Sequence, residues 1–201
     1  MDHHLIPEQS GEAFVLRELS ATGATPSTGK WKVHPKSDGL FLIEDTGTLR
    51  HLRAGFSLSD LDVVGTTAVI TEETLASVSL EAAALAVNGQ LIRAYAWGTT
   101  AANANIKTIR LKFGATVVAI NDVTIAPVGV VWELRAIVAR TGAATQEAVG
   151  NGVVGAVAQT VSNTQPAETL SGAVAVALTG QNGIAAANEI VCRGLLVEVM
   201  Q

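Results

Sequence analysis

Few side chains in this sequence combine the residue types and spacings that catalyse reactions. The nearest match to a phosphate-binding loop is the stretch Gly23–Lys30, which has five residues between its two glycines where a P-loop has four. Trp31 stands where Ser or Thr would bind magnesium, and no helical pattern follows it. We therefore reject a nucleotide-binding loop here.

Histidines are the next candidates, because cupin-type barrels hold a metal with several of them. His3 and His4 are adjacent and lack a third partner, so we interpret them as exposed polar residues. His34 and His51 lie in a small strand-rich segment, and no histidine follows residue 51. A histidine-based metal site is thus excluded from the later part of the chain, and we predict no metal and no cofactor.

Nucleophiles and paired carboxylates are equally sparse. Cys192 lies in a predicted strand with no histidine in the same region, so we interpret it as a small core residue rather than a nucleophile. No G-x-S-x-G nucleophile elbow occurs. The carboxylates that a glycosidase would need are scattered, and we interpret them as solvated: Glu72, Glu73, Asp122, Glu133, Glu147 and Glu168. We predict no catalytic residues and no enzymatic activity.

Aromatic side chains offer one binding hypothesis. Tyr95, Trp97 and Trp132 could form a platform on which a sugar stacks, as in a lectin-like module. However, Tyr95 and Trp97 share a strand face with Leu91, so we favour the interpretation that they fill the core. A host glycan is kept as an alternative partner.

These residues belong to a chain whose dominant pattern is the alternation of β-strands. In Lys107–Phe113, Ile109, Leu111 and Phe113 fall on one face, and Thr108, Arg110 and Lys112 fall on the other. Further strands are predicted at Leu75–Leu80, Leu91–Thr99, Thr116–Ile120, Val130–Arg140, Thr145–Thr160 with a bulge or break near 150–152, Leu170–Leu178 and Glu189–Met200. Eight short strands separated by Gly and Asn turns predict an antiparallel jelly-roll sandwich.

The rest of the chain divides into shorter segments. We predict an N-terminal arm at 1–11, a small β-hairpin module at 12–54, a linker at 55–73 and the jelly-roll domain at 74–201. The module contains a three-stranded meander, with strands at Lys30–His34, Leu40–Ile43 and Thr48–Leu52. In the linker, Ser57–Asp62 is expected to form a short helical turn and Val63–Ile70 a strand.

Composition limits the partners. The formal net charge is −5 without a basic run, so no nucleic acid is expected. No apolar stretch approaches the roughly 20 residues of a membrane-spanning helix. Charged residues make up 15% of the chain, against roughly 25% in an average domain. We therefore expect apolar surface to be buried between subunits.

Two stretches resemble proteins of tailed bacteriophages. The segment 29–52, with Lys36–Phe41 and Asp45–Gly47, resembles the short β-hairpin module near the N-termini of fibre and head-decoration proteins, although Val33 and Phe41 stand where those proteins usually have Tyr. The second stretch resembles the C-terminal jelly roll of phage virion proteins in its segments 85–89, 97–99, 107–114, 132–134 and 139–146. Such domains typically assemble as trimers.

The resemblance implies a virion structural protein, without fixing its position on the virion. We expect it to be made in the bacterial cytoplasm and, under our first hypothesis, to lie on the outer capsid surface. Our first hypothesis is a capsid decoration, or cement, protein: a homotrimer that binds the major capsid protein lattice and stabilises the head. The alternative is a short head or tail fibre whose jelly roll recognises a host surface glycan. A chain of 201 residues without a long shaft favours the first.

Overall fold

The computed structural model of the chain describes residues 32–36, 39–43, 49–51, 57–123, 129–159 and 161–200, with side chains described within 57–121, 129–159 and 161–200. The chain forms two compact units, Met1–Arg53 and Ala54–Gln201. The predicted arm at 1–11 and the stretch Gly23–Lys30 lie outside the described residues.

The first unit contains a three-stranded antiparallel sheet in the order β1-β2-β3. Its strands are β1 (Lys32–Lys36), β2 (Gly39–Ile43) and β3 (Leu49–His51). Each strand pairs with the next along the chain, so that Val33 faces Leu42 and Phe41 faces His51. This is the meander that the alternating runs and their Gly-containing turns predict.

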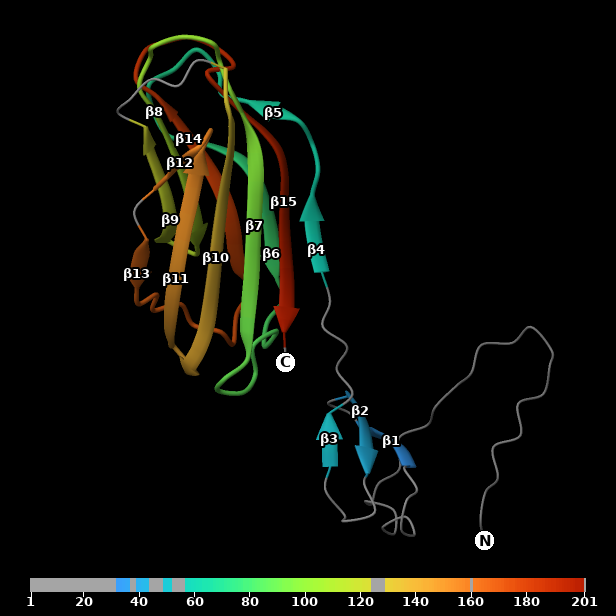
Figure 1. Cartoon of the computed structure of the whole chain (residues 1–201). Helices are drawn as coiled ribbons and strands as arrows, with labels where there is room; N and C mark the ends of the chain where they lie inside the picture. Colours follow the sequence, from blue (N-terminus) through green and yellow to red (C-terminus); the bar gives the residue numbers. More distant parts are fainter. Residues whose placement is uncertain are drawn as a thin grey trace, which may run out of the picture. The chain divides into compact units, whose positions relative to one another are not determined.

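The second unit is a sandwich of two antiparallel sheets, visible as two layers in Figure 1. The large sheet has the order β12-β11-β10-β7-β15-β4, with β13 beside β11 and β5 beside β15. The small sheet has the order β6-β14-β8-β9. The strands are β4 (Ser57–Asp60), β5 (Val64–Gly65), β6 (Glu73–Leu80), β7 (Leu91–Thr100), β8 (Lys107–Phe113), β9 (Thr116–Val123), β10 (Val131–Gly142), β11 (Thr145–Val154), β12 (Val157–Ala158), β13 (Ser162–Thr164), β14 (Val174–Asn182) and β15 (Ile190–Met200).

The all-β prediction is confirmed for the described part of the chain, which contains no helix. Accordingly, no helix long and apolar enough to cross a membrane occurs among those residues.

The strand pairing of the sandwich is nested. β4 pairs with β15, β7 with β10, β6 with β14 and β8 with β9. The chain therefore folds like one long hairpin that is bent over itself. Two of its paired strand sets lie in the large sheet and the other two lie in the small sheet. Nested pairing of this kind is what a jelly roll requires. β11 extends the large sheet beyond β10, and the short strands β12 and β13 border it.

The first strand of this nested set lies in the segment that sequence analysis assigned to the linker at 55–73. The expected helical turn at Ser57–Asp62 is wrong, because Ser57–Asp60 is strand β4 and pairs with β15. Its polar sequence fits an edge strand that has few inward positions to fill. Asp60 points to the seam between the sheets, where its Oδ2 accepts a hydrogen bond from the backbone N–H of Ser77 at 3.0 Å.

The bulge or break predicted near Gly150–Gly152 is also wrong, because β11 runs through both glycines and keeps its register with β10 there. A Cβ at Gly150 would lie 2.1 Å from the carbonyl oxygen of Val118, and one at Gly152 would lie 1.9 Å from Oδ1 of Asn121. These glycines let β9 of the small sheet approach β11 closely. The strand ends instead before the turn at Gly155, which has a φ of 59°.

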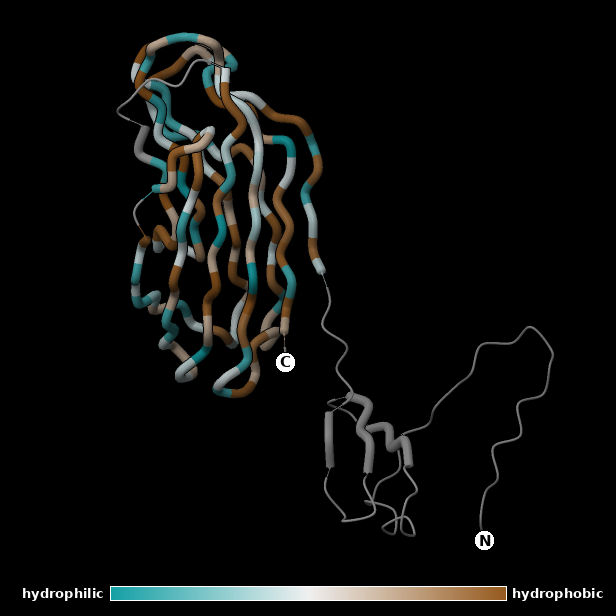
Figure 2. Tube along the Cα trace, viewed as in Figure 1, coloured by the Kyte–Doolittle hydropathy of each residue, from teal (hydrophilic) through white to brown (hydrophobic). Residues whose placement is uncertain are grey.

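The core lies between the two sheets and takes one face of each strand, so that apolar and polar positions alternate along the tube in Figure 2. β8 shows the rule, since Ile109, Leu111 and Phe113 are fully buried as predicted. On β7 the inward residues between Ile92 and the strand end are small. A Cβ at Gly98 would lie 2.4 Å from the ring of Trp132, so the absence of a side chain there makes room for this buried indole.

The substitution Phe113→Asp tests this core. Phe113 is fully buried, and removing a buried Phe side chain alone costs about 3–5 kcal/mol. An unpaired buried charge adds to that cost, so we expect the variant to be unfolded or insoluble. Ala175→Asp is the control, because Ala175 lies on the adjacent strand β14 and is exposed. Circular dichroism and soluble yield measure the outcome, and a folded Phe113→Asp variant would refute the strand assignment.

Candidate functional site

The outer face of the large sheet carries the most concentrated set of functional side chains in the described residues. On β7, Ile92, Ala94 and Ala96 point into the core, so Arg93, Tyr95 and Trp97 point outward. The interpretation that Tyr95 and Trp97 fill the core is therefore wrong. The alternating pattern correctly placed both aromatics on one face of the strand. That face is the outer one, because the small alanines on the opposite face pack against the other sheet.

Tyr95 and Trp97 form a stacked pair on this outer face. Their ring centroids are 5.3 Å apart, with an angle of 23° between the ring planes. The Trp97 ring lies over Gly194 of β15, because a Cβ at that position would come within 2.4 Å of it. A bulge between Cys192 and Gly194 places this glycine opposite Trp97. The two strands thus build a flat aromatic surface that is only partly exposed.

A charged pair on β10 adjoins the aromatic pair. The Tyr95 hydroxyl donates to Oε2 of Glu133 at 2.7 Å, and Nη2 of Arg135 donates to Oε1 of the same carboxylate at 3.0 Å. The Arg135 guanidinium also lies 5.2 Å from the Tyr95 ring centroid. The bond from Tyr95 holds the pKa of Glu133 below its ordinary value, despite partial burial. Glu133 in turn raises the pKa of Tyr95.

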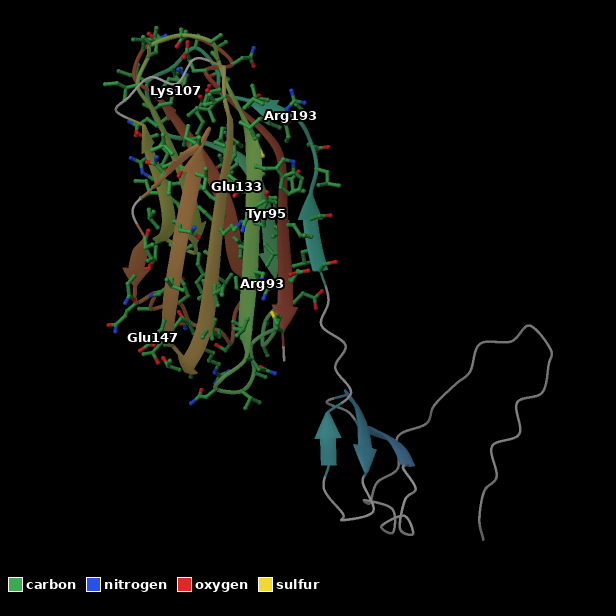
Figure 3. All side chains as sticks on the ribbon, viewed as in Figure 1. Arg93, Tyr95, Lys107, Glu133, Glu147 and Arg193 are labelled. Carbon is green, nitrogen blue, oxygen red and sulfur yellow. The ribbon has the colours of Figure 1, made fainter. Side chains whose placement is uncertain are left out.

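A groove of about 740 Å³ runs across the same face, over β15, β7, β10 and β11 (Figure 3 labels Arg93, Tyr95 and Glu133 on these strands). We call it the outer-face groove. Three of its apolar side chains are exposed: Ile137 at 39%, Val149 at 47% and Val161 at 63%. Arg93 and Glu198 border it with an ion pair of 3.8 Å. An apolar surface with a few charges at its margin suits a protein segment or a sugar ring better than a free ion.

A second cluster lies at the end of the sandwich where the β7–β8 and β14–β15 loops meet (Figure 3 labels Lys107). Nζ of Lys107, whose side chain is fully buried, lies 3.1 Å from Oε2 of Glu189. It also donates to Oδ1 of Asn103 at 2.8 Å and to the carbonyl oxygen of Asn105 at 2.9 Å. Burial opposes the charged form of Glu189, but hydrogen bonds from Lys107, Asn103 and Asn105 outweigh it and hold the pKa of this carboxyl below its ordinary value.

The other residues singled out from the sequence are dispersed. Trp132 is buried and cannot form a platform with Tyr95 and Trp97. Cys192 lies in the core as predicted, and burial raises the pKa of its thiol to about 11, so it is not a thiolate at neutral pH. His34 and His51 lie in β1 and β3 of the first unit. His3 and His4 lie outside the described residues.

Most of the scattered carboxylates have structural partners. Glu72 contacts Nζ of Lys112 at 2.8 Å, Glu73 accepts hydrogen bonds from Thr67, and Glu168 accepts one from the backbone N–H of Ala115. Glu147 is exposed on β11. The side chain of Asp122 lies outside the described ones. Where side chains are described, no three His, Cys, Asp or Glu residues gather as a metal site would need.

Sequence reasoning missed both the outer-face groove and the Lys107 cluster. Lys107 is in phase with Ile109, Leu111 and Phe113, so counting one step back along the strand would have placed it on the core face. A lysine at such a position needs a partner. Its partner Glu189 is more than 80 residues away, and no local pattern connects them.

Comparison with known proteins gives little more. No protein-family model matches this sequence, and no curated protein matches it either. The fold is similar to part of a solved structure, the infectious bursal disease virus VP2 subviral particle, with a TM-score of 0.31 and 13% sequence identity. The alignment covers 74% of this chain and 32% of the VP2 chain, so this chain spans about a third of that protein.

Titration of Tyr95 tests the outer-face network. Tyr95 is the only tyrosine of the chain, so the ultraviolet absorbance of tyrosinate reports it alone. Its hydroxyl donates to Glu133, and losing the proton would place two negative charges side by side. We expect its pKa to exceed the ordinary value of 10.0. In Glu133→Gln the pKa should fall toward that value. A wild-type pKa at or below 10.0 would contradict the geometry.

Proposed function

We propose that this protein is a structural component of a virus particle: a decoration protein that assembles as a homotrimer and binds the major capsid protein of a tailed bacteriophage head. The resemblance of its two β-rich segments to phage virion proteins supports a tailed bacteriophage as the virus to which the protein belongs. The outer-face groove is the structural observation that carries the proposal, because it leaves apolar side chains of the largest sheet uncovered by the described part of the chain.

The groove and the composition lead to the same expectation. A chain with 15% charged residues has few charges with which to cover its surface. Three exposed apolar side chains, Ile137, Val149 and Val161, lie together in the groove across β10, β11 and the segment after β12. Removing apolar surface from water contributes a favourable free energy of roughly 25 cal/mol per Å². We infer that sister copies cover this face in the trimer.

The function would be mechanical rather than chemical. Stable protein interfaces bury on the order of 1,200–2,000 Å². Copies that meet each other and also contact adjacent capsid subunits would add such interfaces across the joints of the shell. The internal pressure of packaged DNA would then have to break these interfaces before the shell could open.

A charge placed in the groove tests the trimer. Val149→Glu puts a carboxylate among the apolar groove residues, and we expect it to shift the protein from trimer to monomer without unfolding it. Val87→Glu is the matched control, because Val87 is also exposed, at 63%, but lies in the β6–β7 loop away from the groove. Light scattering behind size exclusion measures mass. A wild-type monomer, or equal effects of both substitutions, would count against the interface.

Binding to phage heads tests the capsid role. Purified trimer would be added to heads of the encoding phage from which this protein has been deleted. We expect it to bind throughout the head surface and to raise the temperature at which the heads release DNA. Binding confined to the tail or to a single vertex would favour the fibre function, and no binding would overturn the virion proposal.

A second candidate function, recognition of a host surface glycan, has an observation of its own in the Tyr95–Trp97 pair. Aromatic faces beside the hydrogen-bonding groups of Glu133 and Arg135 suit a sugar ring. Binding of purified host polysaccharide, measured by calorimetry, should weaken at least about tenfold in Trp97→Ala, which corresponds to about 1.4 kcal/mol. Trp132 is buried, so its substitution would test folding and not binding. Undiminished binding by Trp97→Ala would exclude this platform.

A further inference from the structure

The Lys107 cluster holds an amine and a side-chain amide in contact, beside a carboxylate. Nζ of Lys107 is 2.8 Å from Oδ1 of Asn103. A buried lysine requires a negative partner, and the ion pair with Glu189 at 3.1 Å provides one. The three N–H groups of the buried ammonium each need an acceptor, and Oδ1 of Asn103, the carbonyl oxygen of Asn105 and Oε2 of Glu189 are those acceptors. The same arrangement holds the side-chain amide of Asn103 against the amine.

The carboxylate of Glu189 contacts both groups at once. Its Oε2 is the atom next to Nζ of Lys107, and its Oε1 accepts a hydrogen bond from Nδ2 of Asn103 at 2.8 Å. Asn105 donates to the same Oε1 at 3.0 Å and holds the carboxylate in place. Glu189 can therefore take a proton from the amine on one side and deliver it to the amide nitrogen on the other.

We propose that Lys107 and Asn103 form an intramolecular isopeptide bond, from Nζ to the side-chain carbon Cγ, with Glu189 as the group that transfers the proton. The inference rests on the geometry of this cluster and is independent of the function proposed above. No cofactor, metal or oxidant takes part.

The reaction balances within these three side chains. Glu189 accepts a proton from the Lys107 ammonium, which leaves a neutral amine. The amine attacks Cγ of Asn103, so the Nζ–Cγ bond forms and a tetrahedral intermediate results. A proton passes through Glu189 to Nδ2, the Cγ–Nδ2 bond breaks, and ammonia leaves. The products are a secondary amide and one ammonia molecule, and the carbon is neither oxidised nor reduced. The second proton of the ammonium is left on the Glu189 carboxyl, from which the departing ammonia can take it as ammonium.

Two physical effects make this slow reaction accessible. Groups held in contact react as if at an effective concentration of about 10⁵–10⁸ M when their geometry is well aligned. The reaction also needs to occur only once in each chain. Because the ammonia then diffuses away, the bond accumulates even when the rate is low.

The cross-link would fix the start of β8 to the loop before it. Backbone hydrogen bonds already shape that loop, from the N–H of Asn103 to the carbonyl of Ala101 and from the N–H of Ala101 to the carbonyl of Glu189. Because the bridged segment is short, the gain in stability from loop closure is small. The main consequence is that the β7–β8 loop would keep its conformation next to β8 even when the surrounding hydrogen bonds break.

Mass spectrometry of the full-length protein decides the proposal. After expression and incubation until the spectrum no longer changes, we expect an intact mass, measured under denaturing conditions, that is lower than the sequence mass by one ammonia molecule. Trypsin should fail to cleave after Lys107, and fragment ions from backbone breaks between residues 103 and 107 should be absent. The full sequence mass together with cleavage after Lys107 would overturn the proposal, whatever the variants do.

Variants separate this bond from other losses of ammonia. Lys107→Arg keeps the positive charge without a reactive amine, and we expect it to have the full mass. A loss that persists in this variant would indicate cyclisation of an asparagine on its own backbone and would contradict the proposal. Glu189→Gln should slow the loss at least tenfold. Lys112→Arg is the matched control, because Lys112 pairs with Glu72 on the outer face of the small sheet, and the loss should remain.

Discussion

Every strand of the large sheet has two faces, and the small sheet can cover only one of them. The inner face is filled by residues such as Ile92, Leu134 and Val197, which are fully buried. The outer face has no covering layer among the described residues and carries the stacked Tyr95–Trp97 pair and the outer-face groove. Proteins commonly leave one face of an antiparallel sheet in water, but that face is then polar. Here it is mixed, because Ile137, Val149 and Val161 are exposed beside Arg93, Arg135 and Glu198. The proposed assembly follows from these uncovered apolar side chains.

The close packing of the two sheets depends on small residues and on polar side chains that replace missing backbone partners. The glycines of β11 leave space for β9 to approach, and the glycine of β7 leaves space for the buried indole of Trp132. At the seams, Asp60 accepts a hydrogen bond from the edge of β6, and the Gln146 amide makes two hydrogen bonds to the backbone of Glu168. These contacts satisfy backbone polar groups at the places where the two sheets and their loops meet. The outer-face groove leaves Ile137, Val149 and Val161 exposed and is the surface to which we assign a partner.

The sequence was sufficient to predict the long strands, because β7, β8, β10 and β15 alternate with few interruptions. It was insufficient where a residue is explained by a contact with another residue far away in the sequence. Ser57–Asp60 reads as a turn because its single Asp closes a seam, and Gly150 reads as a break because it admits another strand. Alternation also could not say which face of β7 is inside, since both faces carry apolar residues. The ion pair of Lys107 with Glu189 joins positions that only the folded topology brings together.

The central claim is that the outer face of the large sheet is buried between copies. Hydroxyl-radical footprinting of the full-length protein, read residue by residue by mass spectrometry, tests it most directly. The account predicts that Ile137, Val149 and Val161 are oxidised far less than their exposure in a single chain implies. Val87 and Val157, at 63% and 61% exposure, serve as internal references that should react fully. Equal reactivity of both groups in the undiluted protein would contradict the account.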